Sequence, residues 1–155
     1  MYAKKIKCML VLFSLLFATA CLRDSGVNIE EDFPPNPHGV VIINEIEYSM
    51  GKGGYRWEKK EGLTMQVVTT DAASPNQIAA NFEAIQVTTP SEVTIAFDSN
   101  PQISVFLWNK DERDKEVAQS NGKFEAPLEE GRYIYEVFAE WKNGAASYTF
   151  VIEVD

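Results

Sequence analysis

Residues 129–155, with the sequence EEGRYIYEVFAEWKNGAASYTFVIEVD, form the stretch that decides the fold. Apolar side chains recur at every second position on both sides of a short polar break, which is the spacing of two β-strands that each bury one face. Asn143-Gly144 lies in this break. Both central residues of a type I′ turn need a positive φ, which Asn tolerates and Gly adopts freely. The stretch therefore predicts a closing β-hairpin with Asn143-Gly144 as its turn.

The start of this hairpin resembles the tyrosine corner of immunoglobulin-like domains, in which an acid, a glycine and a tyrosine occupy alternate positions before strand F. Gly131 and Tyr133 occupy the glycine and tyrosine positions. The resemblance implies that the Tyr133 hydroxyl bonds to upstream backbone, and that residues 102–108 form strand C with Trp108 in the core. Tyr135 stands where antibody domains have their second cysteine, so the resemblance is to the sandwich alone.

The remaining chain adds further short strands and one helix. Apolar alternation and β-branched residues predict strands over residues 40–48 with a bulge near Glu45, 55–58, 63–70, 92–97, 102–108 and 123–126. Residues 50–54 are expected to be a glycine-rich turn, and the charged residues 110–122 an exposed loop. Ser74 and Pro75 predict the N-cap and first position of a short helix over residues 76–83. We expect an all-β, immunoglobulin-like antiparallel β-sandwich with one short helix over residues 40–155.

The first twenty residues have the composition of a secretory signal peptide. Three lysines precede an apolar run at residues 9–17, and the small residues 18–20 follow. The apolar run is too short to span a bilayer.

Residues 18–21, Ala-Thr-Ala-Cys, resemble the lipobox of bacterial lipoproteins, with Ala18 in place of the usual Leu. In that family the chain is cut before the cysteine, which becomes the N-terminus and carries a diacylglycerol with acyl chains such as palmitate. The resemblance implies that Cys21 is lipidated. The alternative is an ordinary signal peptide, which would leave an exposed, reactive thiol at the first mature position. Residues 21–39 are then expected to be a flexible, proline-rich linker.

Several segments of the domain also resemble a module found in small lipoproteins of Gram-positive bacteria. They are Gly54-Tyr55-Arg56-Trp57, residues 71–75, Pro101-Gln102-Ile103, residues 131–141, Gly144 and Ser147-Tyr148-Thr149-Phe150. This resemblance covers residues 40–155 and implies localisation and fold, but no residue with a transferable activity.

The net negative charge disfavours anionic lipid and nucleic acid as partners. The formal net charge is −9, and removal of residues 1–20 with their three lysines would make it −12. An acidic domain is repelled from an anionic lipid surface within a Debye length of about 8 Å. Nucleic acid is disfavoured as well, because no basic patch interleaved with aromatic residues is present.

Reactive residues are scarce. His38 is the single histidine, and Cys21 would be the single cysteine of the mature chain, so a nucleophilic triad, a zinc site and an internal disulfide are not expected. The acids of residues 111–116 alternate with basic residues that neutralise them, which argues against a calcium loop. We therefore expect no enzyme activity, metal or cofactor. A pair of converging carboxylates is the remaining enzymatic alternative.

The three tryptophans are candidates for a binding surface for glycan or peptide. Trp108 and Trp141 lie in strand patterns and are expected in the core. For Trp57, beside Arg56 and the predicted glycine turn, a core position and a surface position both remain open, so it is the candidate aromatic ligand contact.

Together these features predict a lipid-anchored, non-catalytic binding or accessory module on the outer face of the cell membrane. The lipid anchor would hold it there, an envelope protein would be its partner, and the loop at residues 110–122 would be the contact surface. The main alternative is an inhibitor of an extracytoplasmic protease or hydrolase that acts through an exposed loop. A structural component of the envelope without a discrete ligand also remains open.

Overall fold

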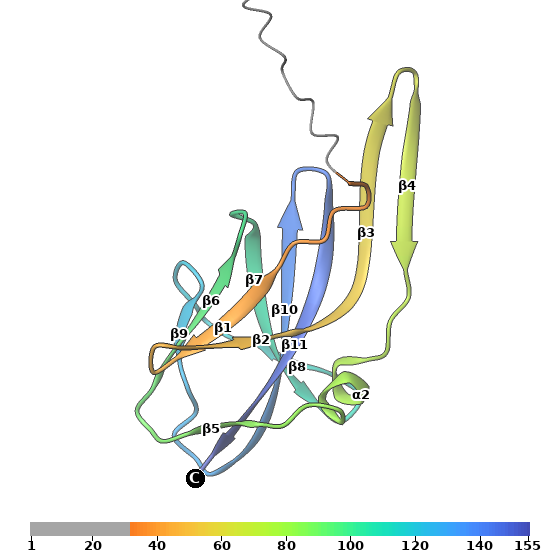
Figure 1. The fold of residues 1–155 in the computed structure, drawn as a ribbon. Helices are drawn as coiled ribbons and strands as arrows, with labels where there is room; N and C mark the ends of the chain where they lie inside the picture. Colours follow the sequence, from red (N-terminus) through yellow and green to blue (C-terminus); the bar gives the residue numbers. More distant parts are fainter. Residues whose placement is uncertain (1–31) are drawn as a thin grey trace, which may run out of the picture. The chain divides into compact units, whose positions relative to one another are not determined.

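The computed structural model describes residues 32–155, so the predicted signal peptide, lipobox and Cys21 lie outside the described residues. Residues 32–155 form one compact unit. Two β-sheets and one short helix make up this unit (Figure 1). The prediction of an all-β, sandwich-like fold with one short helix is confirmed.

The smaller sheet has four strands. Their order is β2 (Ile46–Ser49), β1 (Gly39–Ile43), β6 (Glu92–Phe97) and β9 (Lys123–Glu125). The larger sheet runs through β4 (Thr64–Thr70), β3 (Gly51–Glu61), β11 (Gly144–Val154), β10 (Gly131–Trp141), β7 (Gln102–Asn109) and β8 (Glu112–Glu116). A short strand, β5 (Ile85–Val87), pairs in parallel with the end of β11.

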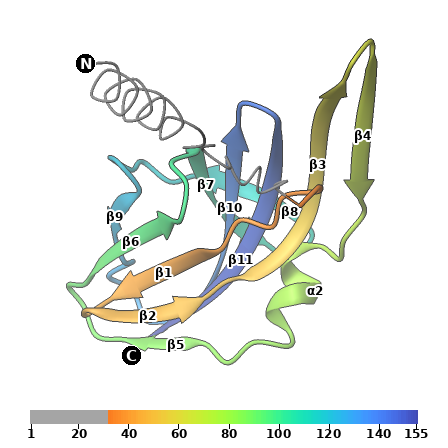
Figure 2. The same ribbon diagram turned by 45° about the horizontal axis from the view of Figure 1, so that its top comes forward.

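The middle of the larger sheet has the strand order that the tyrosine-corner resemblance predicts. β11, β10 and β7 are consecutive neighbours and pair antiparallel, as strands G, F and C do in immunoglobulin-like sandwiches. β1 and β2, together with the long hairpin of β3 and β4, precede this core in the sequence. That hairpin extends beyond the turn of β10 and β11 in both ribbon views (Figures 1 and 2).

Aromatic packing joins the two sheets. Tyr135 of β10 and Phe150 of β11 stack with ring centroids 4.9 Å apart and an interplanar angle of 8°. Phe124 of the smaller sheet lies against Tyr135 at 5.4 Å. Tyr135, which stands where antibody domains have their second cysteine, therefore joins the two sheets through its contact with Phe124 in a buried apolar cluster.

The closing hairpin forms as predicted, but its turn is one residue earlier. Trp141 pairs with Gly144, so the two turn residues are Lys142 and Asn143, and the prediction of an Asn143-Gly144 turn is wrong. Gly144 is the first residue of β11. A Cβ there would collide with the carbonyl oxygen of Arg56 on the neighbouring β3. Glycine is needed at this position for the close approach of two backbones, not for a turn.

Two expectations near the start of the domain are also wrong. Residues 50–54 are not a turn, because Gly51–Glu61 is a continuous strand. A Cβ on Gly53 would collide with the side chain of Ser147 on β11, so this glycine too permits strand contact. Instead of a bulge near Glu45, Asn44 and Glu45 form the two-residue turn between β1 and β2, with φ of 52° and 65°.

The helix α2 (Pro75–Ala79) is shorter than predicted but starts where expected. Ser74 caps it and forms a capping box with Gln77. The helix contacts β3, β10 and β11. Its C-terminal end accepts a hydrogen bond from Arg132 of β10, whose Nη2 lies 3.2 Å from the carbonyl oxygen of Ala79.

Residues 32–38, the end of the predicted linker, lie against the domain. The hydroxyl of buried Tyr148 donates a hydrogen bond to the carbonyl oxygen of Pro37 at 2.9 Å. Lys52 of β3 donates to the Asn36 side chain at 2.7 Å. The side chain of His38 is exposed, while its carbonyl oxygen accepts a hydrogen bond from the Asp98 amide at 3.3 Å. The chain therefore joins the domain along β3.

The glycine contact between β3 and β11 gives a stability prediction. Gly144→Ala should lower the free energy of unfolding by about 1–3 kcal/mol, because the added methyl group overpacks against β3. Gly54→Ala is the matched control, since the nearest atom to its Cβ is the Thr70 carbonyl oxygen at 3.3 Å. Urea unfolding measures both. Equal losses of unfolding free energy in the two variants would contradict the close contact of Gly144 with β3.

Burial of Tyr148 predicts a loss of stability at alkaline pH. Desolvation raises its pKa from 10.0 to about 12, and desolvation also raises the pKa of Tyr135. Below pH 10 both tyrosine hydroxyls are protonated in the folded and in the unfolded protein, so their contribution to stability is fully present there. This stability should be lost as the pH rises from about 10 to 12. Tyr148→Phe should give a smaller loss over that interval in thermal melts, and an unchanged loss would contradict the assignment.

Candidate binding surface

Trp57 is a core residue, so the prediction that it is a candidate aromatic ligand contact is wrong. Only 1% of its surface is accessible. Its ring lies 5.2 Å from that of Trp141, with an interplanar angle of 45°. The misplaced glycine turn explains the error, because Trp57 lies in the middle of β3 and faces the core. It is not available as a ligand contact.

Trp108 is not in the core, which corrects the second tryptophan prediction. In β7 the core-facing residue Val105 lies opposite Val137, so Trp108, three positions later, faces the outer side of the sheet. Its indole donates a hydrogen bond to Glu136 at 2.7 Å. Trp141 packs at the margin of the core and donates to the Ser99 hydroxyl at 2.6 Å.

Glu136 is a buried acid whose two carboxylate oxygens are both occupied. Arg113 of β8 donates to them from Nε at 2.9 Å and from Nη2 at 3.0 Å. The guanidinium also lies over the Phe106 ring, 4.1 Å from its centroid. The hydrogen bond to Glu136 raises the pKa of Arg113 in spite of partial burial. This bidentate pair fixes β8 to the sheet, and neither oxygen of the Glu136 carboxylate is left without a hydrogen bond.

Residues 110–122 are not one continuous loop, because they contain a strand, although most of them are exposed as predicted. Lys110 and Asp111 form a turn, Glu112–Glu116 is the edge strand β8, and Ser120 bridges to Lys123. All five residues of β8 are charged and exposed.

The tyrosine corner has the geometry that the resemblance implies. The Tyr133 hydroxyl donates to the carbonyl oxygen of Glu129 at 2.9 Å. Gly131 has a φ of 148°, which favours glycine over residues with a side chain. Both residues fix the start of β10 and lie away from any cavity described below.

A cavity of about 570 Å³ lies between the β6–β7 turn and the turn before β9. Its lining residues are Ile95, Ala96, Phe97, Ser99, Asn100, Pro101, Gln102, Ile103, Gln119, Asn121 and Gly122. None of these side chains is ionisable, so the cavity supplies no acid, base or charged ligand. Within residues 32–155, no cluster of three metal-ligating side chains occurs.

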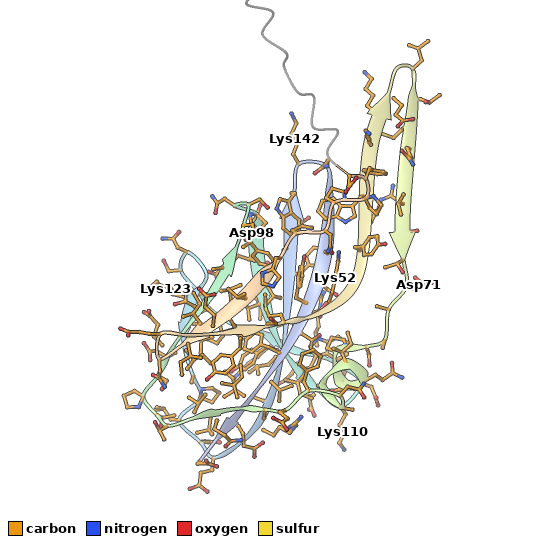
Figure 3. All side chains as sticks on the ribbon, in the orientation of Figure 1. Lys52, Asp71, Asp98, Lys110, Lys123 and Lys142 are labelled. Carbon is orange, nitrogen blue, oxygen red and sulfur yellow. The ribbon has the colours of Figure 1, made fainter. Side chains whose placement is uncertain are left out.

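The surface that stands out is the hairpin of β3 and β4, and we call residues 56–70 the projecting hairpin. Leu63 at its turn is fully exposed, and Met65 and Val67 of β4 are 55% and 43% exposed. Large apolar side chains elsewhere in the described domain are mostly buried in the core. Figure 3 shows the hairpin side chains extending away from the body of the domain.

β4 is an edge strand with an unusual composition. Its sequence, TMQVVTT, has no charge, no proline and no glycine. The opposite edge of the same sheet, β8, has the sequence ERDKE. Edge strands of soluble proteins are normally protected by charges, prolines, bulges or short length. β4 is seven residues long and has none of these protections, so its free edge can accept another strand.

Comparison with protein-family models, with curated proteins and with solved structures returns no match. No helix between residues 32 and 155 has the length and hydropathy needed to cross a membrane.

Proposed function

We propose that this chain is a lipid-anchored, non-catalytic binding module of the bacterial cell envelope, held on the outer face of the cell membrane by Cys21. The observation that carries the binding role is the unprotected edge of β4. The lipobox resemblance of residues 18–21 supports the location.

Strand addition is the binding mode that this edge favours. An extended segment of a partner would pair with the free backbone groups of β4, and its side chains would cover Met65 and Val67. Backbone pairing supplies affinity, while contacts with alternate side chains supply specificity. Two other features of the domain favour a binding site less: Glu136 is fully bonded to Arg113 and Trp108, and the cavity beside the β6–β7 turn has no ionisable side chain.

A different protein suits this edge better than a second copy of the chain. Two antiparallel β4 strands would place the two Phe33 residues at opposite ends of the shared sheet, because Phe33 lies beside Lys59 near the end of the hairpin. Copies anchored in one membrane need both points of attachment on the same side. Two mature chains would each carry a formal charge of −12 and repel one another.

The alternative function is inhibition of an extracytoplasmic protease or hydrolase. Leu63 favours it, because a fully exposed leucine on a two-residue turn has the form of a side chain that enters a specificity pocket. The two functions use different parts of the hairpin. Inhibition requires the tip, whereas strand addition requires the edge of β4.

Photo-crosslinking in intact cells tests the binding role. With benzoylphenylalanine in place of Met65, the full-length protein should give one discrete adduct in the membrane fraction. Val67→Lys in the same chain should abolish it, because a charge at the edge opposes strand addition, and Glu58 opposite makes the lysine tolerable within the hairpin. Val67→Thr is the matched control and should retain the adduct.

The other outcomes are equally decisive. An adduct at the mass of two chains would show a second copy at the edge and contradict the choice of partner. Benzoylphenylalanine can also be placed at position 115, in place of Lys115 on the charged edge β8. An adduct that forms equally well from this position would contradict the role of β4. Cys21→Ser should move the protein out of the membrane fraction, and its retention there would contradict the anchor.

A further inference from the structure

We propose that the tip of the projecting hairpin, at Gly62-Leu63, rests on the lipid surface of the membrane that holds the anchor. This inference rests on the proposed lipid anchor and gives the hairpin a second contact, separate from the strand partner of β4.

The tip presents an uncovered apolar group. Glu61 pairs with Thr64, so Gly62 and Leu63 are the two turn residues, and Gly62 has a φ of 60°. This turn directs Leu63 away from both strands, where no described residue covers it. Met65 follows two positions later and is also exposed. Lipid is a surface that can cover a single apolar tip without a matching pocket.

The first described residues lie on the hairpin side of the domain. Phe33 lies beside Lys59, with the ammonium group 5.9 Å from the ring centroid, and Asn36 bonds to Lys52 further from the tip. The first described residues therefore run from the hairpin toward the body of the domain. Cys21 precedes Asp32 by eleven positions, which allows a reach of at most about 40 Å. The described domain thus begins beside the hairpin, and a tether of this reach allows the tip to meet the lipid that holds the anchor.

Charge favours the same orientation. The projecting hairpin has three cations against two acids, Glu58 and Glu61. The mature chain as a whole would have a formal charge of −12. Anionic lipid attracts cations near its surface and repels an acidic domain within a Debye length. The hairpin therefore has a net charge of +1 and is not repelled by an anionic membrane as the acidic domain is, which refines the expectation that the whole domain stands away from lipid.

The contact need not be strong. A single leucine gives weak membrane binding by itself, but a tether converts that binding into an intramolecular event at high effective concentration. Resting on its tip, the hairpin would present the β4 edge parallel to the membrane normal. A strand partner in the same membrane would then meet β4 from the side.

Fluorescence at the tip tests the inference. Full-length lipidated protein carrying Leu63→Cys is labelled with the environment-sensitive dye NBD and placed in phosphatidylglycerol vesicles. Acylation blocks Cys21 and cleavage removes Cys8, so the label is unique. The NBD emission should shift to shorter wavelength and be quenched by doxyl-labelled lipid. Leu128→Cys is the matched control, since Leu128 is also an exposed leucine but precedes Glu129 and Glu130.

The outcomes separate this inference from the proposed function. Quenching at position 63 and none at 128 supports contact of the tip with lipid. No quenching at either position, with the protein still bound to vesicles, overturns the inference and leaves the anchor intact. Protein that does not stay with the vesicles overturns the anchor itself. Quenching at 63 only after a membrane protein is added would assign the tip to a protein partner and also overturn the inference.

Discussion

The close approach of β3 to β11 is the constraint on which the rest of the domain depends. Gly144 and Gly53 leave no side chain between the two backbones, so β3 can pair with β11, the last strand of the sandwich-like fold. This pairing buries Trp57 against Trp141 and extends the larger sheet by one long hairpin. The same glycines therefore decide where the core ends and where the exposed edge begins.

The two edges of the larger sheet have opposite chemistry. β8 is fully charged, and the bidentate bonds from Arg113 to the buried Glu136 hold it in place. β4 has no charge and belongs to a hairpin that extends beyond the core. A domain that protects one edge and leaves the other open has a preferred side for strand addition. This asymmetry connects the fold to the proposed binding role.

Much of the fold followed from local patterns, whereas the candidate site did not. The hairpin of β10 and β11, the capped helix and the hydrogen bond of Tyr133 depend on residues close together in sequence, and these were predictable. The glycines before Trp57 were misread, because a glycine pattern does not distinguish a turn from close strand contact. The sequence of β4 was recognised as a strand, but its position at an edge depends on pairing partners distant in sequence. Trp108 was misplaced because a strand that is apolar on both faces does not reveal which face is inward.

Amide hydrogen exchange of β4 tests the central claim most directly. The claim is that this edge is free in the isolated protein and paired in the cell envelope. In detergent-purified full-length protein, the outward amides of residues 64–70 should exchange rapidly, and in native membranes they should become protected, while those of β8 remain unchanged. Slow exchange of β4 in the purified protein, or the same rapid exchange in native membranes, would contradict the claim.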